Sequence, residues 1–127
     1  MGFAIPAAIG AAIAKPDHKV VAVVGDGGAQ MTSEELIVAG QEHLPITFVV
    51  INNRRLGMVR QGHREQLGGD AFATVITSPD FVQLARAYGL RALRVSKLGM
   101  LAATLKRSLG GRKPTLLEVL VEPEAEV

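Results

Sequence analysis

The stretch Lys19–Val24 (KVVAVV) decides the fold, and Ile46–Ile51 (ITFVVI) repeats its character further along the chain. Each is a short run of aliphatic, mostly β-branched residues that ends at turn-forming residues. This pattern is typical of strands buried on both faces of a sheet. Between them, Thr32–His43 (TSEELIVAGQEH) opens with hydroxyl residues and glutamates, as helices commonly do. Together the three segments predict a β-α-β unit.

The same alternation continues on both sides of this unit. Further strands are predicted at Leu90–Val95 and Thr115–Val121, and further helices at Gly2–Ala14, Ser78–Tyr88 and Lys97–Leu109. Ser78 is expected to cap its helix, with Pro79 in the first helical position. Residues 54–77 are expected to form a functional loop with some local helix.

These elements predict the α/β fold class, as a three-layer α/β/α arrangement with a mostly parallel sheet of at least four strands. We expect one domain over residues 1–127, a length that suits a single domain. The chain begins with a predicted helix, whereas doubly wound folds usually begin with a strand. The first strand of the fold is therefore expected to be lacking, or to be supplied by another chain.

Composition excludes several classes of protein. The 48% hydrophobic content argues against a disordered chain, and the absence of cysteine excludes disulfides and cysteine-ligated zinc. No apolar stretch approaches the roughly 20 residues that cross a bilayer, so no membrane partner is expected. A net charge of +2 does not by itself predict a nucleic-acid partner. A cytoplasmic location is consistent with these features.

Polar residues follow the first two predicted strands, where each strand ends. Gly25-Asp26-Gly27-Gly28 follows the first strand and Asn52-Asn53 ends the second. Ligands of open α/β sheets bind at the carboxyl ends of the strands. A carboxylate and an amide oxygen suit Mg²⁺, which also takes phosphate oxygens as ligands. A diphosphate held through Mg²⁺ is one interpretation, while Asp-Gly or Asn-Asn alone is equally an ordinary turn.

Taken together, Gly25-Asp26-Gly27 and Asn52-Asn53 resemble the signature of thiamine diphosphate enzymes. Met1–Ala11 (MGFAIPAAIGA) and Leu56–Gln61 (LGMVRQ) resemble the acetolactate synthase branch of that family, and Pro79-Asp80-Phe81 fits its next helix. The similarity extends over almost the whole chain. It implies two cofactors, thiamine diphosphate and Mg²⁺, in the C-terminal cofactor-binding domain of the enzyme.

The resemblance also implies roles for particular residues. Asp26 and the Asn53 side chain are the expected magnesium ligands, with the backbone carbonyl of Arg55 as the third. The cofactor-binding residues that it implies are Met1, Gly25, Asp26, Gly27, Gly28, Met31, Asn53 and Met58. Met1 would support the bent cofactor, and Met31 and Met58 would line the cofactor and substrate region. The alternative for these last two methionines is that they fill the core.

The resemblance implies decarboxylation and carboligation of 2-oxo acids. The family's activating glutamate comes from a pyrimidine-binding domain of a neighbouring subunit, and no glutamate of this sequence is assigned that role. We therefore expect a partner chain, or a missing segment, that carries this domain. A homo-oligomer is also expected, because the apolar segment Met1–Ala14 would otherwise form an exposed patch. Gly62 stands where acetolactate synthases typically have tryptophan, which leaves the second substrate open.

Three alternatives concern the chain as a whole and its basic loop. The chain could be a non-catalytic remnant of the domain, either truncated or serving oligomerisation. The basic loop Arg54–Arg64 could bind RNA, but no aromatic stacking platform accompanies it, so no nucleic-acid partner is expected. His63, in the same loop, is a candidate for substrate contact, although a solvated histidine is the more common finding.

Overall fold

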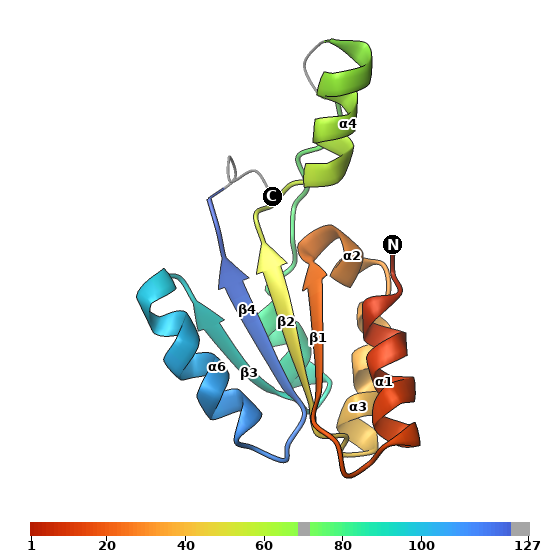
Figure 1. Ribbon diagram of the computed structural model, residues 1–127, viewed down its shortest axis with the longest axis vertical. Coiled ribbons are helices and arrows are strands. Elements are labelled where there is room, and N and C mark those ends of the chain that lie inside the picture. The colour runs from red at the N-terminus through yellow and green to blue at the C-terminus, as the bar shows by residue number, and fades with distance from the viewer. Residues whose placement is uncertain (69–71, 123–127) are drawn as a thin grey trace.

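Four parallel strands form one sheet in the computed structural model, which describes residues 1–68 and 72–122 (Figure 1). They are β1 (Val20–Gly25), β2 (Ile46–Asn52), β3 (Arg91–Val95) and β4 (Thr115–Leu120). Their order across the sheet is β1-β2-β4-β3, and each neighbouring pair is parallel. The prediction of a parallel α/β sheet is confirmed. Residues 69–71 of the predicted 54–77 loop lie outside the described residues.

Helices cover both faces of this sheet (Figure 1). The helices α1 (Ala4–Ala14), α3 (Leu36–Gln41) and α5 (Phe81–Ala87) lie on one face, and α6 (Leu101–Leu109) lies on the other. Side chains of β2 alternate between two cores: Phe48 and Val50 face the first set of helices, while Val49 faces α6. This period of two is what a strand imposes on its side chains. The layered α/β/α arrangement is therefore as predicted.

The edge strand β1 differs from the central strands. Its Ala22 is buried against α1, but Val21 and Val23, which point to the opposite face, are 46% and 64% exposed. The expectation that this strand is buried on both faces is wrong for the described chain. The physical reason is position, because α6 packs over β4 and its neighbours and leaves the corresponding face of β1 uncovered (Figure 1).

The segment after β1 is also more compact than predicted. A short helix, α2 (Asp26–Gln30), begins directly at the end of the strand, where a glycine loop was expected. The predicted helix Thr32–His43 is divided into a 3₁₀ turn, η1 (Ser33–Glu35), and α3. Asp26 occupies the first turn of α2, where a carboxylate is favoured by the helix dipole.

The described residues of the segment 54–77, which are 54–68 and 72–77, form an excursion beyond the carboxyl end of the sheet. Much of it is the helix α4 (Gly57–Leu67), none of whose residues is buried, and Figure 1 shows it standing clear of the other helices. An antiparallel bridge between Arg55 and Val75 closes the base of the excursion. The segment is thus more helical than the predicted loop, and Gly68 ends α4 in the left-handed conformation that glycine favours.

Two other helices begin later than the sequence suggested. Asp80 is the N-cap of α5, and its side chain accepts a hydrogen bond from the Gln83 backbone N–H at 3.0 Å. The assignment of Ser78 as the cap is therefore wrong, because Ser78 is hydrogen-bonded elsewhere. The predicted helix Lys97–Leu109 consists of a 3₁₀ turn, η2 (Leu98–Met100), followed by α6. Within the described ranges, no helix is long and apolar enough to cross a membrane.

Candidate functional site

Asp26 is a buried carboxylate at the carboxyl end of β1, with only 2% of its surface exposed. Its Oδ1 accepts a hydrogen bond from the Gly27 N–H at 2.9 Å. Its Oδ2 accepts one from the Arg54 N–H at 2.8 Å and one from the Ser78 hydroxyl at 2.9 Å. These three donors are neutral, and an ionised carboxylate has about four lone-pair positions. Asp26 therefore retains the capacity to bind a cation.

Asn52 lies next to Asp26 and shares two of its three donors. The Asn52 Oδ1 is 3.2 Å from the Arg54 N–H nitrogen and 3.3 Å from the Ser78 Oγ. The single hydroxyl proton of Ser78 serves one of the two acceptors at a time. Ser78 was thus misassigned from sequence, and the structure brings it, from a segment 52 residues away, to the candidate metal ligand.

The other two predicted ligands, Asn53 and Arg55, flank Arg54, whose backbone is left-handed with φ 56°. The Asn53 Oδ1 accepts a hydrogen bond from the Arg55 N–H at 3.0 Å. In the bridge that closes the α4 excursion, the carbonyl of Arg54 accepts from the Ile76 N–H at 3.1 Å. The hydrogen bonds of that bridge therefore involve the carbonyl of Arg54 and the N–H of Leu56.

The glycines of the first strand end have a packing role as well. A Cβ atom added at Gly27 would lie 2.5 Å from the Leu56 Cδ2, and one at Gly28 would lie 3.1 Å from the Val24 Cγ2. Gly25 has open space at the same position. Close approach inside the chain is therefore one reason for glycine at positions 27 and 28, beside the approach to a ligand that the sequence suggested.

The three methionines of the predicted site lie on the surface of the described chain. Met1, Met31 and Met58 are each more than half exposed, so the alternative that Met31 and Met58 fill the core is wrong. A Cβ atom added at Gly2 would lie 3.6 Å from the Met31 Cβ. The start of the chain and the turn after α2 therefore meet, which brings Met1 and Met31 into one region.

Glu118, in the middle of β4, was not singled out from the sequence. Its carboxylate is 1% exposed, and its Oε1 accepts a hydrogen bond from the Asn52 Nδ2 at 2.7 Å. Its Oε2 accepts one from the Arg94 Nε at 2.6 Å. A glutamate is almost never fully buried without a partner. Its place inside the apolar run Thr115–Val121 was the signal that could have identified it.

Arg94 continues this chain of contacts to the surface. Its Nη2 lies 2.8 Å from the Asp80 Oδ1, so it bridges the buried Glu118 and the exposed N-cap of α5. Hydrogen bonds to Glu118 and Asp80 raise the pKa of the Arg94 guanidinium. The Gln83 backbone N–H and then the Arg94 side chain lower the pKa of Asp80. Both residues therefore keep their charges at neutral pH.

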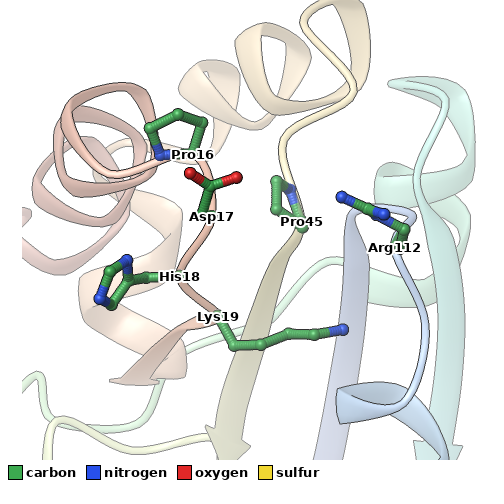
Figure 2. Close-up of a pocket in the computed structure, with 6 residues that line it drawn as sticks. All are labelled: Pro16, Asp17, His18, Lys19, Pro45 and Arg112. Atoms are coloured by element: carbon green, nitrogen blue, oxygen red, sulfur yellow. The ribbon is translucent and has the colours of Figure 1, made fainter.

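A separate hollow lies at the opposite, amino end of the sheet (Figure 2). It is lined by Pro16, Asp17, His18, Lys19, Pro45 and Arg112, and its volume is about 260 Å³, somewhat below the roughly 300–1,000 Å³ of typical ligand pockets. The Lys19 ammonium donates a hydrogen bond to the Gly111 carbonyl, and in Figure 2 the His18 ring points away from Lys19. Ligands of α/β sheets bind at the carboxyl ends, so this hollow is not the candidate site.

Among residues 1–68 and 72–122, histidine and acidic side chains do not assemble a separate metal centre. In the part of the chain that the structure describes, no group of three His, Cys, Asp or Glu residues could hold a metal ion. His63 lies half-buried within α4. A metal at the carboxyl end of β1 would therefore bind one carboxylate with amide, carbonyl and ligand oxygens. Such a set suits Mg²⁺ and does not suit zinc, which prefers histidine and cysteine.

Known proteins are similar to this chain in both sequence and fold. Residues 1–119 match the family model described as thiamine pyrophosphate enzyme, C-terminal TPP binding domain. The chain is 38% identical to a probable acetolactate synthase large subunit of Methanocaldococcus jannaschii, over 97% of this chain and 21% of that protein. It is 40% identical to the mitochondrial acetolactate synthase catalytic subunit of Saccharomyces cerevisiae, over 100% of this chain and 18% of that protein.

A solved structure extends the similarity to three dimensions. The thiamine diphosphate-dependent 4-hydroxybenzoylformate decarboxylase of Rhodococcus jostii RHA1 matches with a TM-score of 0.90 and 33% identity, over 96% of this chain and 23% of that one. The chain thus spans about a fifth of the length of the curated relatives. The predicted cofactors, thiamine diphosphate and Mg²⁺, are those of this family. The chain belongs to the thiamine pyrophosphate enzyme family, as a C-terminal TPP-binding domain.

Proposed function

We propose that this chain holds thiamine diphosphate through Mg²⁺ at the carboxyl ends of β1 and β2, as the cofactor-binding part of an acetolactate-synthase-like enzyme. The single observation that carries the proposal is the buried Asp26 carboxylate, whose three donors are neutral. Burying an ionised carboxylate is costly unless it is paired or coordinates a metal. A magnesium ion would supply that compensation.

The proposed ligand set is Asp26, the Asn53 side chain and the Arg55 backbone carbonyl. Mg²⁺ usually binds one or two carboxylates and completes its octahedron with phosphate oxygens and water. The left-handed Arg54 supports this set, because it turns the chain sharply between Asn53 and Arg55, the two ligands that the segment after β2 would contribute. The cofactor diphosphate would complete the coordination and approach the backbone of Gly25, Gly27 and Gly28.

Two buried polar atoms in the segment that follows the glycines after β1 also suit an anionic ligand. The Gln30 Nε2 and the Thr32 Oγ1 have no hydrogen-bond partner within the described residues. Buried polar groups are nearly always satisfied, so such atoms suggest a missing ligand or water. Met1 and Met31 would cover the apolar part of the cofactor beside them, and Met58 would do so from α4. A methionine suits this task because its side chain adapts to irregular apolar surfaces.

When bound, thiamine diphosphate supplies the carbanion-stabilising chemistry by which 2-oxo acids lose carbon dioxide and join a second carbonyl compound. This chain's residues would bind and orient the cofactor and help to exclude water. The activating glutamate would come from a pyrimidine-binding domain, in a partner chain or in a longer polypeptide. Substrates of the 2-oxo acid class are proposed from the acetolactate synthase relatives, and the second substrate stays open.

Self-association is part of the proposal, although its basis differs from the one expected from sequence. Half of α1 is already covered, since Ile5 and Ile9 pack in the core. The exposed apolar side chains Val21 and Val23 on β1 now supply the reason for a partner surface. A cytoplasmic location stays a prediction, because the Saccharomyces cerevisiae relative is named as mitochondrial.

Calorimetric titration with thiamine diphosphate, with and without Mg²⁺, tests the proposed site. We expect binding that requires Mg²⁺ and that disappears in Asp26→Ala, because the variant removes the only carboxylate of the ligand set. At 100 times the dissociation constant, bound cofactor should stabilise the fold by about 2.7 kcal/mol. Asp17→Ala, at the exposed amino end of the sheet, is the matched control and should bind as the wild type does. Absence of binding in folded wild-type protein would refute the proposal.

Pyruvate consumption distinguishes the catalytic function from the remnant. The chain is mixed with the pyrimidine-binding domain of an acetolactate synthase, and the release of carbon dioxide is followed. Turnover that depends on both components and on Asp26 would support the enzyme function. Cofactor binding without turnover, in a complex shown to form, would favour a non-catalytic remnant.

A further inference from the structure

We propose that Glu118 is a positioning residue for the magnesium site: through Asn52 it holds Arg54, and with it the ligands on either side. This inference rests on the proposed Mg²⁺ site. Glu118 itself would touch neither the metal nor the cofactor. Its effect would pass through one side chain, Asn52, which lies between β4 and the turn after β2.

The first step is the contact between Glu118 and Asn52. The two residues lie on paired strands and are 66 positions apart in sequence; Glu118 is opposite Val50, two positions before Asn52. The Asn52 Nδ2 donates to the Glu118 Oε1 at 2.7 Å, at the short end of the range for an N–H···O hydrogen bond. Because the amide nitrogen faces Glu118, the amide oxygen must point the other way.

The Asn52 amide oxygen reaches the backbone N–H of Arg54. The Asn52 Oδ1 and the Asp26 Oδ2 both accept from the Arg54 N–H, at 3.2 Å and 2.8 Å. Arg54 has a positive φ, which for a residue other than glycine is a strained conformation. The hydrogen bonds from the Arg54 N–H to Asp26 and Asn52 offset the energetic cost of that conformation. Glu118 therefore fixes the amide orientation that keeps Arg54 in place, and Asn53 and Arg55 follow from it.

Arg94 compensates for the burial of the Glu118 carboxylate in β4. Burial of an unpaired carboxylate is costly, but the Arg94 Nε lies 2.6 Å from the Glu118 Oε2, and Arg94 reaches Asp80 at the surface. One carboxylate oxygen of Glu118 thus pairs with the Arg94 guanidinium, while the other orients the Asn52 amide. An apolar residue would pack at this position without either contact. On this proposal, the buried carboxylate of Glu118 serves to hold the turn after β2 in place.

Metal affinity provides the main test. Mn²⁺, which also takes oxygen ligands, replaces Mg²⁺, and free Mn²⁺ is measured by electron paramagnetic resonance in the presence of thiamine diphosphate. We expect Glu118→Gln and Asn52→Leu each to weaken Mn²⁺ binding by about 10- to 100-fold, as loss of outer-shell partners does. The double variant should bind about as weakly as Asn52→Leu alone, because Glu118 acts through Asn52.

A matched control separates positioning from lost stability. Thr115 is a buried polar residue on the same strand, and its hydroxyl donates to the Lys113 carbonyl at the amino end of the sheet. Thr115→Val should lower the melting temperature while changing the Mn²⁺ dissociation constant by less than about twofold. The proposal is overturned if Glu118→Gln binds Mn²⁺ as the wild type does. It is also overturned if the loss of affinity follows the melting temperature in all variants, Thr115→Val included.

Hydrogen exchange in the metal-free protein decides the case independently of the cofactor. The Arg54 amide should exchange faster in Glu118→Gln and Asn52→Leu than in the wild type, and unchanged in Thr115→Val. An unchanged Arg54 amide in Glu118→Gln would overturn the positioning role, whatever the metal titration gives. If the wild type binds no Mn²⁺ but this amide responds as expected, the proposed cofactor function has failed and the control of Arg54 by Glu118 stands.

Discussion

The two ends of the sheet carry polar residues of opposite kinds. At the carboxyl end, Asp26, Asn52 and Glu118 are buried and joined to donors from other segments. At the amino end, the residues around the hollow are mostly exposed, and Lys19 contacts a backbone carbonyl. The difference teaches that a hollow and a cluster of compensated buried polar groups need not coincide in one molecule. Buried polar groups whose burial must be compensated point to the site more reliably.

The comparison also separates stability from binding. Helices that precede strands end at the amino edge of the sheet. The contacts at that edge therefore determine how closely the helices pack against one another and against the sheet. The contacts at the carboxyl edge would, on the proposed function, orient side chains toward a ligand. Substitutions at the two edges should therefore affect different measurements, and three predictions test that separation from the largest expected effect to the smallest.

The largest effect is expected for Gly40→Ala at the amino edge. A Cβ atom there would lie 2.1 Å from the Tyr88 carbonyl oxygen, which belongs to the backbone and cannot rotate away. Overpacking of this kind costs about 1–3 kcal/mol or more in unfolding free energy, measured by urea denaturation. In Gly10→Ala, the control, the added methyl meets no atom within 4 Å and should stabilise α1 by about 0.5–1 kcal/mol. Equal stabilities of the two variants would contradict the close approach of α3 and α5.

A smaller effect, with a defined pH dependence, is expected for Asp80→Asn at the carboxyl edge. Asparagine still caps α5, so the variant mainly loses the ion pair with Arg94. The folded-state pKa of Asp80 is lowered from its ordinary 3.8. Its stabilising contribution is therefore present above that value and is lost as pH falls through the lower, folded-state pKa.

Thermal unfolding of both proteins between neutral and strongly acidic pH measures this effect. The wild type should be the more stable protein at neutral pH, and the difference should shrink below about pH 4. A difference that grows on acidification would show that the sign is wrong. The Mn²⁺ affinity of Asp80→Asn should fall less than that of Glu118→Gln, since Asp80 is one contact further from Asn52.

The smallest effect is expected for the double variant Lys19→Ala/Arg112→Ala, which removes two cations from the hollow of Figure 2. Both side chains are exposed, so the unfolding free energy should change by less than about 0.5 kcal/mol. Affinity for thiamine diphosphate with Mg²⁺ should be unchanged by calorimetry. A loss of affinity comparable to that of Asp26→Ala would place a functional anion site at the amino end. It would contradict the assignment of cofactor binding to the carboxyl end.

Much of the fold could be predicted from the sequence, because the information is local. Short aliphatic, β-branched runs such as Ile46–Ile51 favour strands that are buried from solvent. The glycine and asparagine residues that follow these runs end the strands. Gly25-Asp26-Gly27 and Asn52-Asn53 could be paired in advance, since parallel neighbouring strands deliver their ends to one edge. The details of local structure were less accessible: α2, α4 and the Asp80 cap depend on contacts with other segments.

By itself, the sequence determined the family, the α/β class and the position of Asp26 at the end of a strand. Only the tertiary structure decided what surrounds that carboxylate. Ser78 reaches Asp26 across 52 positions, and Glu118 reaches Asn52 across 66. It also decided that β1, which is aliphatic like the central strands, leaves Val23 exposed. The physical reason is common to all three: hydrophobic pattern and turn residues specify each element, whereas the neighbours of a side chain depend on how distant elements pack.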